Sequence, residues 1–317
     1  MLILRYEDCL YMFADRLKFY LSNAKSKYVT YPKFVFLCGK DYKDNFELSN
    51  RGVIEQYIAT LDKGVKFVLS ECVVDQVSDT DKPANLVLFE EVLAELSDAF
   101  ILFLESMGTS CELGAFTYDD NQFKEKLIIV EDLKFKDAPS FLNQGAIAKA
   151  KDNNSSVVYS HLDDGGLLSS NELRISIKKM IDDFHSIKPI NRRYINLQED
   201  KVLLNSFAIE ILELINLFQP ISKKDLLNVY KRIKGFSSFT FAKSDTKGFN
   251  KTVHFSWILA LLKDSGLIDI SDSGKRITSK QLVNYSFMFD ISDKAMHKER
   301  SWYLSKLYKS GEIVCLH

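Results

Sequence analysis

The sequence predicts an α/β fold: a doubly wound parallel sheet followed by a mainly helical winged helix-turn-helix domain. Its 317 residues suffice for about two domains, and 46% of them are hydrophobic and 27% charged, as in globular proteins. In the first half, short apolar runs alternate with amphipathic stretches, which is typical of α/β domains. In the second half, helical spacing of apolar residues dominates.

The first half begins with an expected amphipathic helix over about residues 7–22. The run KFVFLC at 33–38, which ends before Gly39, is typical of a parallel strand buried on both faces. In such sheets ligands bind outside the carboxyl ends of the strands. Further strands are predicted at 66–69, 99–104, 126–130 and 157–159, and further helices at 50–61, 86–97 and 109–117.

The sequence of the second half predicts three helices and a hairpin, which follow a segment at 151–171 that is partly linker. Ser222 is the expected N-cap of a helix with Asp225 in its first turn. The stretch LIDISDSGKRIT favours a two-stranded hairpin, and helices followed by a hairpin are the order of a winged helix-turn-helix. Other helices are expected at 171–185, 201–218 and 252–264, with 234–249 unassigned, and the predicted domains are 1–160, 161–198 (a helical linker) and 199–317.

Charge is divided unevenly along the chain. Residues 1–160 hold 18 Lys and Arg against 25 Asp and Glu, whereas residues 161–317 hold 24 against 18. A basic half is compatible with a nucleic-acid surface, and also with an ordinary solvated one. The five cysteines are far apart without metal-ligand spacing, which predicts a reducing, cytoplasmic location and no metal; no run approaches 18 apolar residues, so no membrane segment is expected.

The densest candidate site lies around the predicted third strand. Glu105 follows that strand, a glycine turn comes next, and Glu112 falls in the first turn of the following helix, so both carboxylates are expected to face one crevice. Glycosyl transfer uses such a pair, because a carboxylate can attack or stabilise a positively charged sugar carbon. The alternative is a capping box, Thr109-x-x-Glu112. The amides of Gly108 and Thr109 could bind phosphate, or form a simple turn.

Other nucleotide and nucleic-acid signals are weaker. Neither a GxGxxG fingerprint nor a P-loop occurs, since CGKD after the first strand offers a single glycine. Lysines interleave with phenylalanines over 234–251, which is compatible with nucleic-acid contact and equally with an ordered loop. The residues predicted to contact nucleic acid, at the third helix and the wing tip, are Lys251, Lys275 and Arg276.

Three stretches between about residues 33 and 147 carry a resemblance to a known family. They are Phe36-Leu-Cys-Gly39, the run from Ser97-Asp98 through Glu105-Ser-x-Gly108-x-x-x-Glu112-Leu-Gly114-Ala-Phe116, and Ser140-Phe-Leu-Asn143-x-Gly145. They resemble the nucleoside 2-deoxyribosyltransferase-like effectors of retron antiphage systems, which also have a carboxyl-terminal winged-helix-like module. The resemblance implies Glu112 as the catalytic carboxylate; Glu105, from the position after the strand, is the second predicted catalytic residue. The implied substrate-binding residues are Cys38, Gly39, Glu71, Asp98, Gly108, Thr109 and Asn143. For Glu71 the match is weaker, because Ser70 stands where relatives usually have Pro.

The resemblance also implies a function. The expected protein is a toxin that hydrolyses the N-glycosidic bond of NAD or of adenine nucleotides, without a resident cofactor. Its expected partners are a reverse transcriptase and the branched multicopy single-stranded DNA/RNA hybrid that it carries, and a homo-oligomer is compatible with the sequence. NAD is favoured, because nicotinamide leaves without prior protonation and no general acid stands out. The alternative is a non-catalytic module that senses a nucleotide and binds nucleic acid.

Overall fold

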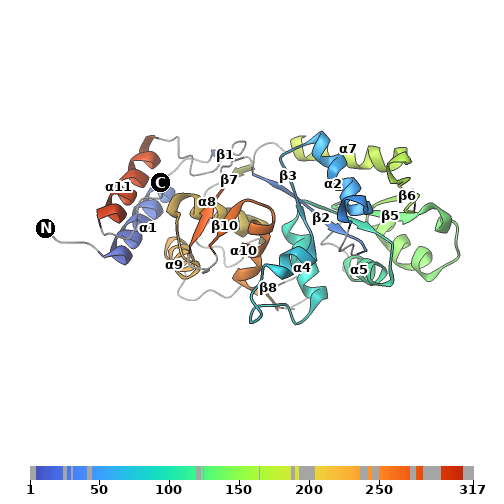
Figure 1. The fold of residues 1–317 in the computed structure, drawn as a ribbon, viewed down its shortest axis with the longest axis horizontal. Coiled ribbons are helices and arrows are strands. Elements are labelled where there is room, and N and C mark those ends of the chain that lie inside the picture. Colours follow the sequence, from blue (N-terminus) through green and yellow to red (C-terminus); the bar gives the residue numbers. More distant parts are fainter. Residues whose placement is uncertain are drawn as a thin grey trace. The chain divides into compact units, whose positions relative to one another are not determined.

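The computed structural model describes most of the chain as two compact units (Figure 1), and each is considered by itself. We call Pro32–Lys188 together with Ser256–Ser265 the α/β unit. The helical unit comprises Met1–Tyr31, Pro189–Phe255 and Gly266–His317. The described residues are 5–23, 27–29, 31–40, 45–118, 123, 125–163, 165–186, 190–192, 204–235, 242–244, 250–271, 276–280 and 294–309.

A five-stranded parallel sheet forms the centre of the α/β unit, as predicted. Its spatial order is β3-β2-β4-β5-β6, so the chain changes direction between β2 and β4. At such a switch point the loops that follow the two strands separate and leave a crevice. The strands are β2 (Lys33–Cys38), β3 (Val65–Val68), β4 (Ala99–Phe103), β5 (Leu127–Asp132) and β6 (Ser156–Ser160).

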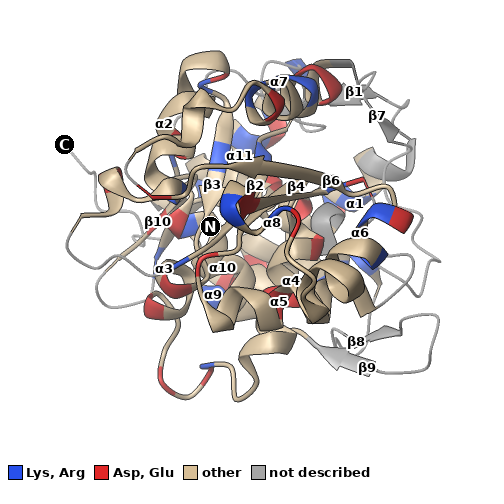
Figure 2. Cartoon of the chain, turned by 90° about the vertical axis from the view of Figure 1, so that its right-hand side faces the viewer, with Lys and Arg blue, Asp and Glu red and all other residues tan. Residues whose placement is uncertain are grey.

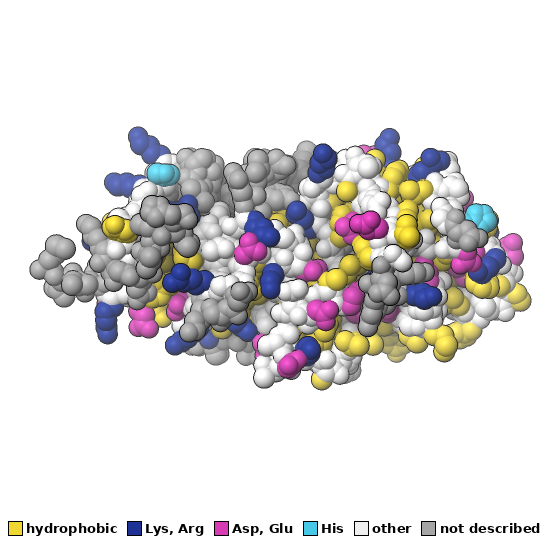
Figure 3. Space-filling view, in the orientation of Figure 1, with side chains coloured by type: hydrophobic (Ala, Val, Ile, Leu, Met, Phe, Trp, Pro, Cys, Tyr) yellow, Lys and Arg dark blue, Asp and Glu magenta, His cyan; other side chains and the backbone are white. Residues whose placement is uncertain are grey.

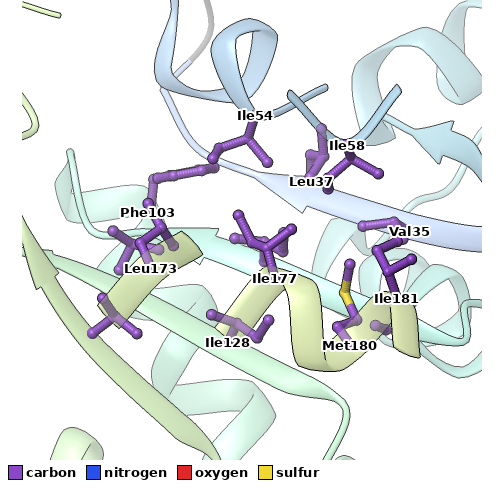
Figure 4. Packing of buried hydrophobic residues seen from close by; sticks show 14 of the residues in the cluster. Val35, Leu37, Ile54, Ile58, Phe103, Ile128, Leu173, Ile177, Met180 and Ile181 are labelled. Carbon is purple, nitrogen blue, oxygen red and sulfur yellow. The ribbon is translucent and has the colours of Figure 1, made fainter. Parts of the chain in front are cut away.

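Helices cover both faces of this sheet (Figure 2). On one face, α2 (Asn50–Leu61) and α7 (Asn171–Ser186) bury isoleucines such as Ile54 and Ile177 against alternate strand residues (Figure 4). On the other face lie α4 (Leu86–Leu96) and α5 (Met107–Tyr118), where Phe116 packs edge-on against Phe100 at 5.1 Å between ring centroids. Both faces are therefore dry, which explains why the strand sequences are continuously apolar.

Shorter elements complete the α/β unit. They are η1 (Phe46–Leu48), α3 (Ser70–Asp75), η2 (Leu133–Phe135), the π-helix η3 (Leu142–Ile147), α6 (Ala148–Asp152) and η4 (Leu167–Ser169). The sequence did not predict α3, η3 or α6, because none is long enough to show a helical period. The helix α6 also occupies the start of the expected 151–171 linker.

The helical unit is built around aromatic side chains that come from distant parts of the chain. Phe13 of α1 (Tyr6–Asn23) stacks on Tyr303 of α11 (Lys294–Lys309), with ring centroids 4.7 Å apart. Phe13 also lies 4.7 Å from Phe218 of α8 (Leu204–Phe218). The predicted domain 1–160 is therefore wrong at its start, since α1 belongs to the helical unit; the helix α7, assigned to a linker at 161–198, belongs to the α/β unit.

The expected hairpin is present in the helical unit. Strands β10 (Ile268–Ile270) and β11 (Ile277–Ser279) pair antiparallel, and Ile221 makes an isolated antiparallel bridge to Ile277. Ser222 caps α9 (Lys223–Lys234) as predicted, because its hydroxyl accepts the Asp225 amide at 3.0 Å. Two further antiparallel pairs, β1 (Lys27–Val29) with β7 (Ile190–Arg192) and β8 (Ala242–Ser244) with β9 (Asn250–Thr252), were not predicted.

The residues predicted to contact nucleic acid differ in their surroundings. Lys251 lies in β9 opposite Lys243, and not at the start of a helix, because α10 begins at Phe255 and runs to Asp264. The side chain of Lys251 and the whole of Lys275 lie outside the described residues. Arg276 is exposed, and its carbonyl accepts the Ser271 amide at 2.9 Å across the hairpin end. Within the ranges that the structure describes, no helix is both long and apolar enough to cross a membrane.

Candidate active site

A cluster of carboxylates surrounds Glu112 on α5, near the carboxyl ends of β2 and β3. The charged groups that shift the pKa of Glu112 are Glu90 on α4, Glu71 on α3 and the guanidinium of Arg51 on α2. Figure 3 shows acidic side chains gathered on the face that carries α4 and α5. Sequence reasoning missed Glu90 and Arg51, although a charged residue inside an otherwise apolar helix face is a signal that could have found them.

Glu112 is the most perturbed carboxyl group of this cluster. Its side chain is half-buried, and Oε2 is buried without a hydrogen-bond partner. Burial first, and then the carboxylates of Glu90 and Glu71, raise the pKa of Glu112 to about 7, whereas Arg51 opposes the rise. A carboxyl group whose pKa lies near neutrality, without a structural bond on Oε2, is a candidate for chemistry.

The start of α5 excludes the capping-box interpretation of Glu112. The helix begins at Met107, and Ser106 and Thr109 cap it reciprocally: Oγ of Ser106 accepts the Thr109 amide at 3.2 Å, and Oγ1 of Thr109 accepts the Ser106 amide at 3.1 Å. The alternative in which Glu112 closes a capping box on Thr109 is therefore wrong, because Thr109 is already inside the helix. Its hydroxyl is used by the cap, and Gly108 beside it is exposed.

Arg51 is a buried cation that orders this region. Its side chain is 3% exposed, its Nη1 pairs with Oε1 of Glu71 at 2.6 Å, and its Nη2 donates to the Lys40 carbonyl at 3.1 Å. A Cβ at Gly39 would lie 3.1 Å from Cγ of Arg51 and 3.1 Å from Oε2 of Glu105, so these side chains would have to shift by a few tenths of an ångström. The predicted binding residues Gly39 and Glu71 therefore share one neighbour, Arg51.

Glu105 has a structural role at the switch point. Its Oε2 accepts the Lys40 amide at 3.0 Å and its Oε1 accepts the side-chain amide of Asn50, which also donates to the Leu162 carbonyl at 2.9 Å. These bonds tie together the loops that follow β2, β4 and β6. The carboxylates that raise the pKa of Glu112 are Glu90 and Glu71, and the pairing of Glu105 with Glu112 stays a prediction.

Two further predicted substrate-binding residues, Asp98 and Asn143, make hydrogen bonds within the fold. Asp98 precedes β4, at the amino ends of the strands, where its carboxylate accepts Nζ of Lys33 at 3.0 Å and the Phe34 amide at 3.0 Å. Its prediction as a site residue is wrong, because a parallel sheet puts Asp98 and Glu112 at opposite edges. The amide of Asn143 on η3 donates to the carbonyls of Phe135 at 2.7 Å and Ala138 at 2.9 Å, and so holds the preceding loop.

Cys38 forms part of the wall below Glu112. It is the last residue of β2 and is 4% exposed. Burial, and then the carboxylate of Glu112, raise the pKa of the Cys38 thiol well above its ordinary value. A thiol of this kind stays protonated at neutral pH, so Cys38 contributes shape to the site and no nucleophile.

Comparison with known proteins gives the class of protein first. The chain belongs to the STM3845 retron effector protein family, whose model matches residues 47–270. It is 30% identical over 223 residues to the "Retron Ec73 putative ribosyltransferase/DNA-binding protein" of Escherichia coli, covering 65% of this chain and 68% of that protein. It is 34% identical over 148 residues to the Escherichia coli protein of the same description from retron Ec86, covering 47% of this chain and 45% of that protein. The expected membership of a retron effector family is confirmed.

Proposed function

We propose that this retron effector is an N-glycosidase that hydrolyses the bond between base and sugar in a nucleotide. The observation that carries the proposal is Glu112: a half-buried carboxyl group with an unpartnered Oε2, near the carboxyl ends of the strands. The relatives' description as ribosyltransferases supports chemistry at a sugar carbon. Glu112 is also the residue that the family resemblance assigns to catalysis.

In the proposed reaction, ionised Glu112 acts on the anomeric carbon of the sugar. The bond from this carbon to the base nitrogen breaks, and its electron pair leaves with the base. The carboxylate stabilises or captures the resulting oxocarbenium ion. A water molecule then adds its oxygen to this carbon and releases a proton. Where Glu112 has bonded to the carbon, that bond breaks in this step and leaves Glu112 ionised again. The pKa of Glu112 near 7, set by burial, makes the carboxylate available from about neutral pH upward.

The cluster supports NAD as the first substrate and adenine nucleotides as the second. Glu71, Glu90 and Glu112 lie together with Arg51, whose charge is paired with Glu71. Such an acidic site stabilises a cationic sugar and repels a triphosphate. The ring nitrogen of NAD is cationic, and nicotinamide leaves as a neutral molecule without a general acid. Adenine would require a proton from one of these carboxyl groups.

The helical unit is proposed to restrain the enzyme through a reverse transcriptase and its branched RNA–DNA. Along the chain, α8, the extended Ile221, α9 and the β10–β11 hairpin follow in the order of a winged-helix-like arrangement, and α10, which is counted with the α/β unit, stands between α9 and the hairpin. The hairpin would be the wing, and exposed Arg276 directly precedes β11. Basic residues there would contact phosphates of the partner nucleic acid.

The test is base release by the purified full-length chain from NAD, ATP and dATP, followed by chromatography. The wild type should release a base, and Glu112→Gln should not. Glu131→Gln is the matched control, because Oε2 of Glu131 is likewise buried without a partner and burial raises the pKa of Glu131 to about 7, but it lies at the end of β5. Release by the Glu112 variant at the wild-type rate would refute the assignment. Tight nucleotide binding by the wild type without release would favour the sensing alternative.

A further inference from the structure

One side of α11, in the helical unit, is exposed and carries basic, hydroxyl and aromatic side chains. Its exposed positions recur every three or four residues, so they lie along one side of the helix, and no acidic residue is among them in the part of α11 whose side chains are described. Figure 3 shows basic side chains projecting from the end of the helical unit that carries this helix. We call these residues the α11 face: Lys294, His297, Lys298, Ser301, Ser305 and Tyr308.

Acidic side chains on α11 and on the neighbouring α1 are paired with arginines, and do not offset the α11 face. Oε2 of Glu299 pairs with Nη1 of Arg16 at 2.9 Å, and the Asp15 carboxylate accepts two N–H groups of Arg232 at 2.7 Å each. No described acid forms an ion pair with either lysine of the α11 face.

The helix α7 shows what an ordinary solvated face looks like in this chain. Its exposed acids and exposed bases balance, which keeps a surface soluble without a field of one sign. The exposed charged residues of α7 are Glu172, Arg174, Lys178, Lys179, Asp182 and Asp183. The α11 face carries charge of one sign only, so solvation alone does not account for it.

Two half-buried residues on the flanks of the α11 face add to this picture. Trp302 is bracketed by cations: the guanidinium carbon of Arg16 lies 4.2 Å from the centre of its ring, and Nζ of Lys306 lies 5.9 Å from it. Nε of Arg300 is buried without a hydrogen-bond partner, and none of the described residues forms an ion pair with this guanidinium. A half-buried cation without a counter-ion is stabilised when an anion binds beside it.

We propose that the α11 face binds the phosphate backbone of the partner nucleic acid. The lysine ammonium groups and serine hydroxyls donate to phosphate oxygens, which gives affinity without reading the bases. At a rise of about 1.5 Å per residue, the face from Lys294 to Ser305 spans about 16 Å, which is the axial rise of about five nucleotides of one strand. The inference rests on the proposed restraint by a nucleic acid, and adds a second contact surface to the hairpin. It concerns residues outside the range 47–270 that matches the family.

The experiment measures how the full-length chain binds a fluorescein-labelled RNA–DNA hybrid duplex of about 20 base pairs, by anisotropy over a series of salt concentrations. The double variant Lys294→Gln/Lys298→Gln removes two charges from the α11 face. It should raise Kd by about tenfold at about 0.1 M salt and reduce the salt slope by about two units. The matched control, Lys178→Gln/Lys179→Gln on α7, removes the same charge from exposed positions and should match the wild type. Arginine at both α11 positions should preserve binding.

Tryptophan fluorescence tests whether the hybrid lies on α11. The chain has two tryptophans, and Trp257 is only 3% exposed, whereas Trp302 lies on the flank of the α11 face. Binding of the unlabelled hybrid should therefore quench the emission of the wild type, and Trp302→Phe should remove this quenching while the affinity persists. Tight binding of the hybrid by the wild type without any quenching would place the nucleic acid elsewhere and overturn the proposal.

The other outcomes separate this inference from the proposed function. No binding of the hybrid by the wild type, an α11 variant with the wild-type Kd and salt slope, or an equal loss in the α7 control would each overturn the proposal. Displacement of the hybrid by polyglutamate at equal charge concentration would assign the face to an acidic protein, and would overturn it too. Base release is measured in the same preparations: its absence from the wild type would refute the proposed hydrolysis, while the binding data would still decide the role of the α11 face.

Discussion

Replacing Glu112 by Gln should make the protein more stable at alkaline pH while it removes activity. The pKa of Glu112 is raised from 4.5 to about 7 by burial, so ionisation of this group disfavours the folded state. The full pKa shift of Glu112 would change the free energy of unfolding by about 3 kcal/mol. Solvent screening of the half-buried side chain reduces this change to about 1–2 kcal/mol. The Gln side chain keeps the shape and carries no charge.

The size of the stability difference depends on pH. Below pH 4.5 the carboxyl is protonated in both the folded and the unfolded chain, and the two proteins should be equally stable. As the pH rises through 7, the wild type loses the stability that the protonated group contributes, and the Gln variant does not. The free energies of unfolding should therefore diverge up to about pH 8, in favour of the variant.

Urea titrations followed by circular dichroism between pH 4.5 and 8 measure this difference. Glu172→Gln, on the exposed first turn of α7, is the control and should change the free energy of unfolding by less than about 0.5 kcal/mol at any pH. A Glu112 variant that is less stable than the wild type by about 1 kcal/mol at pH 8 would refute the reasoning, because it would show that the carboxylate makes a stabilising bond.

Three further predictions follow from the same structure. Asp98→Ala should lower the free energy of unfolding by about 1–3 kcal/mol in urea, because Lys33 loses its partner, while base release per folded molecule stays unchanged. Glu71→Gln should cost about 2–3 kcal/mol in the same assay, because it leaves the buried Arg51 without its counter-ion; equal stability would mean that Arg51 finds another partner. Neutralising the three basic residues of the helical unit should weaken nucleic-acid binding and flatten its salt dependence by roughly one unit per lost phosphate contact, and an unchanged slope would exclude them from the interface. These residues are Lys251, Lys275 and Arg276.

The strands were predictable because each is buried on both faces. A continuous apolar run such as residues 33–38, followed by a glycine, has few interpretations other than a buried strand. In a helix such as residues 50–61, the apolar residues recur with the helical period. The order of the sheet could not be read in this way. It is set by which side of β2 each crossover helix covers, and Asp98 was misplaced because adjacency to a motif does not tell which end of a strand a residue occupies.

The candidate site was only partly predictable for a related reason. Glu112 stood out by its motif, but Arg51, Glu71 and Glu90 come from three different helices and meet only in the folded chain. The assignment of α1 failed in the same way, since the partner of Phe13 is Tyr303 near the other end of the sequence. Local patterns predict elements, whereas contacts between distant segments need the three-dimensional structure.

The discontinuous α/β unit has a consequence for synthesis. Domains generally fold as units, starting from the amino terminus while the ribosome still elongates the chain. Here the sheet and its flanking helices are complete by Lys188, but the unit also needs Ser256–Ser265. A ribosome must therefore translate most of the helical unit before Trp257 can reach Phe89. If the proposed activity requires α10, a nascent or truncated chain that stops before this helix should lack that activity.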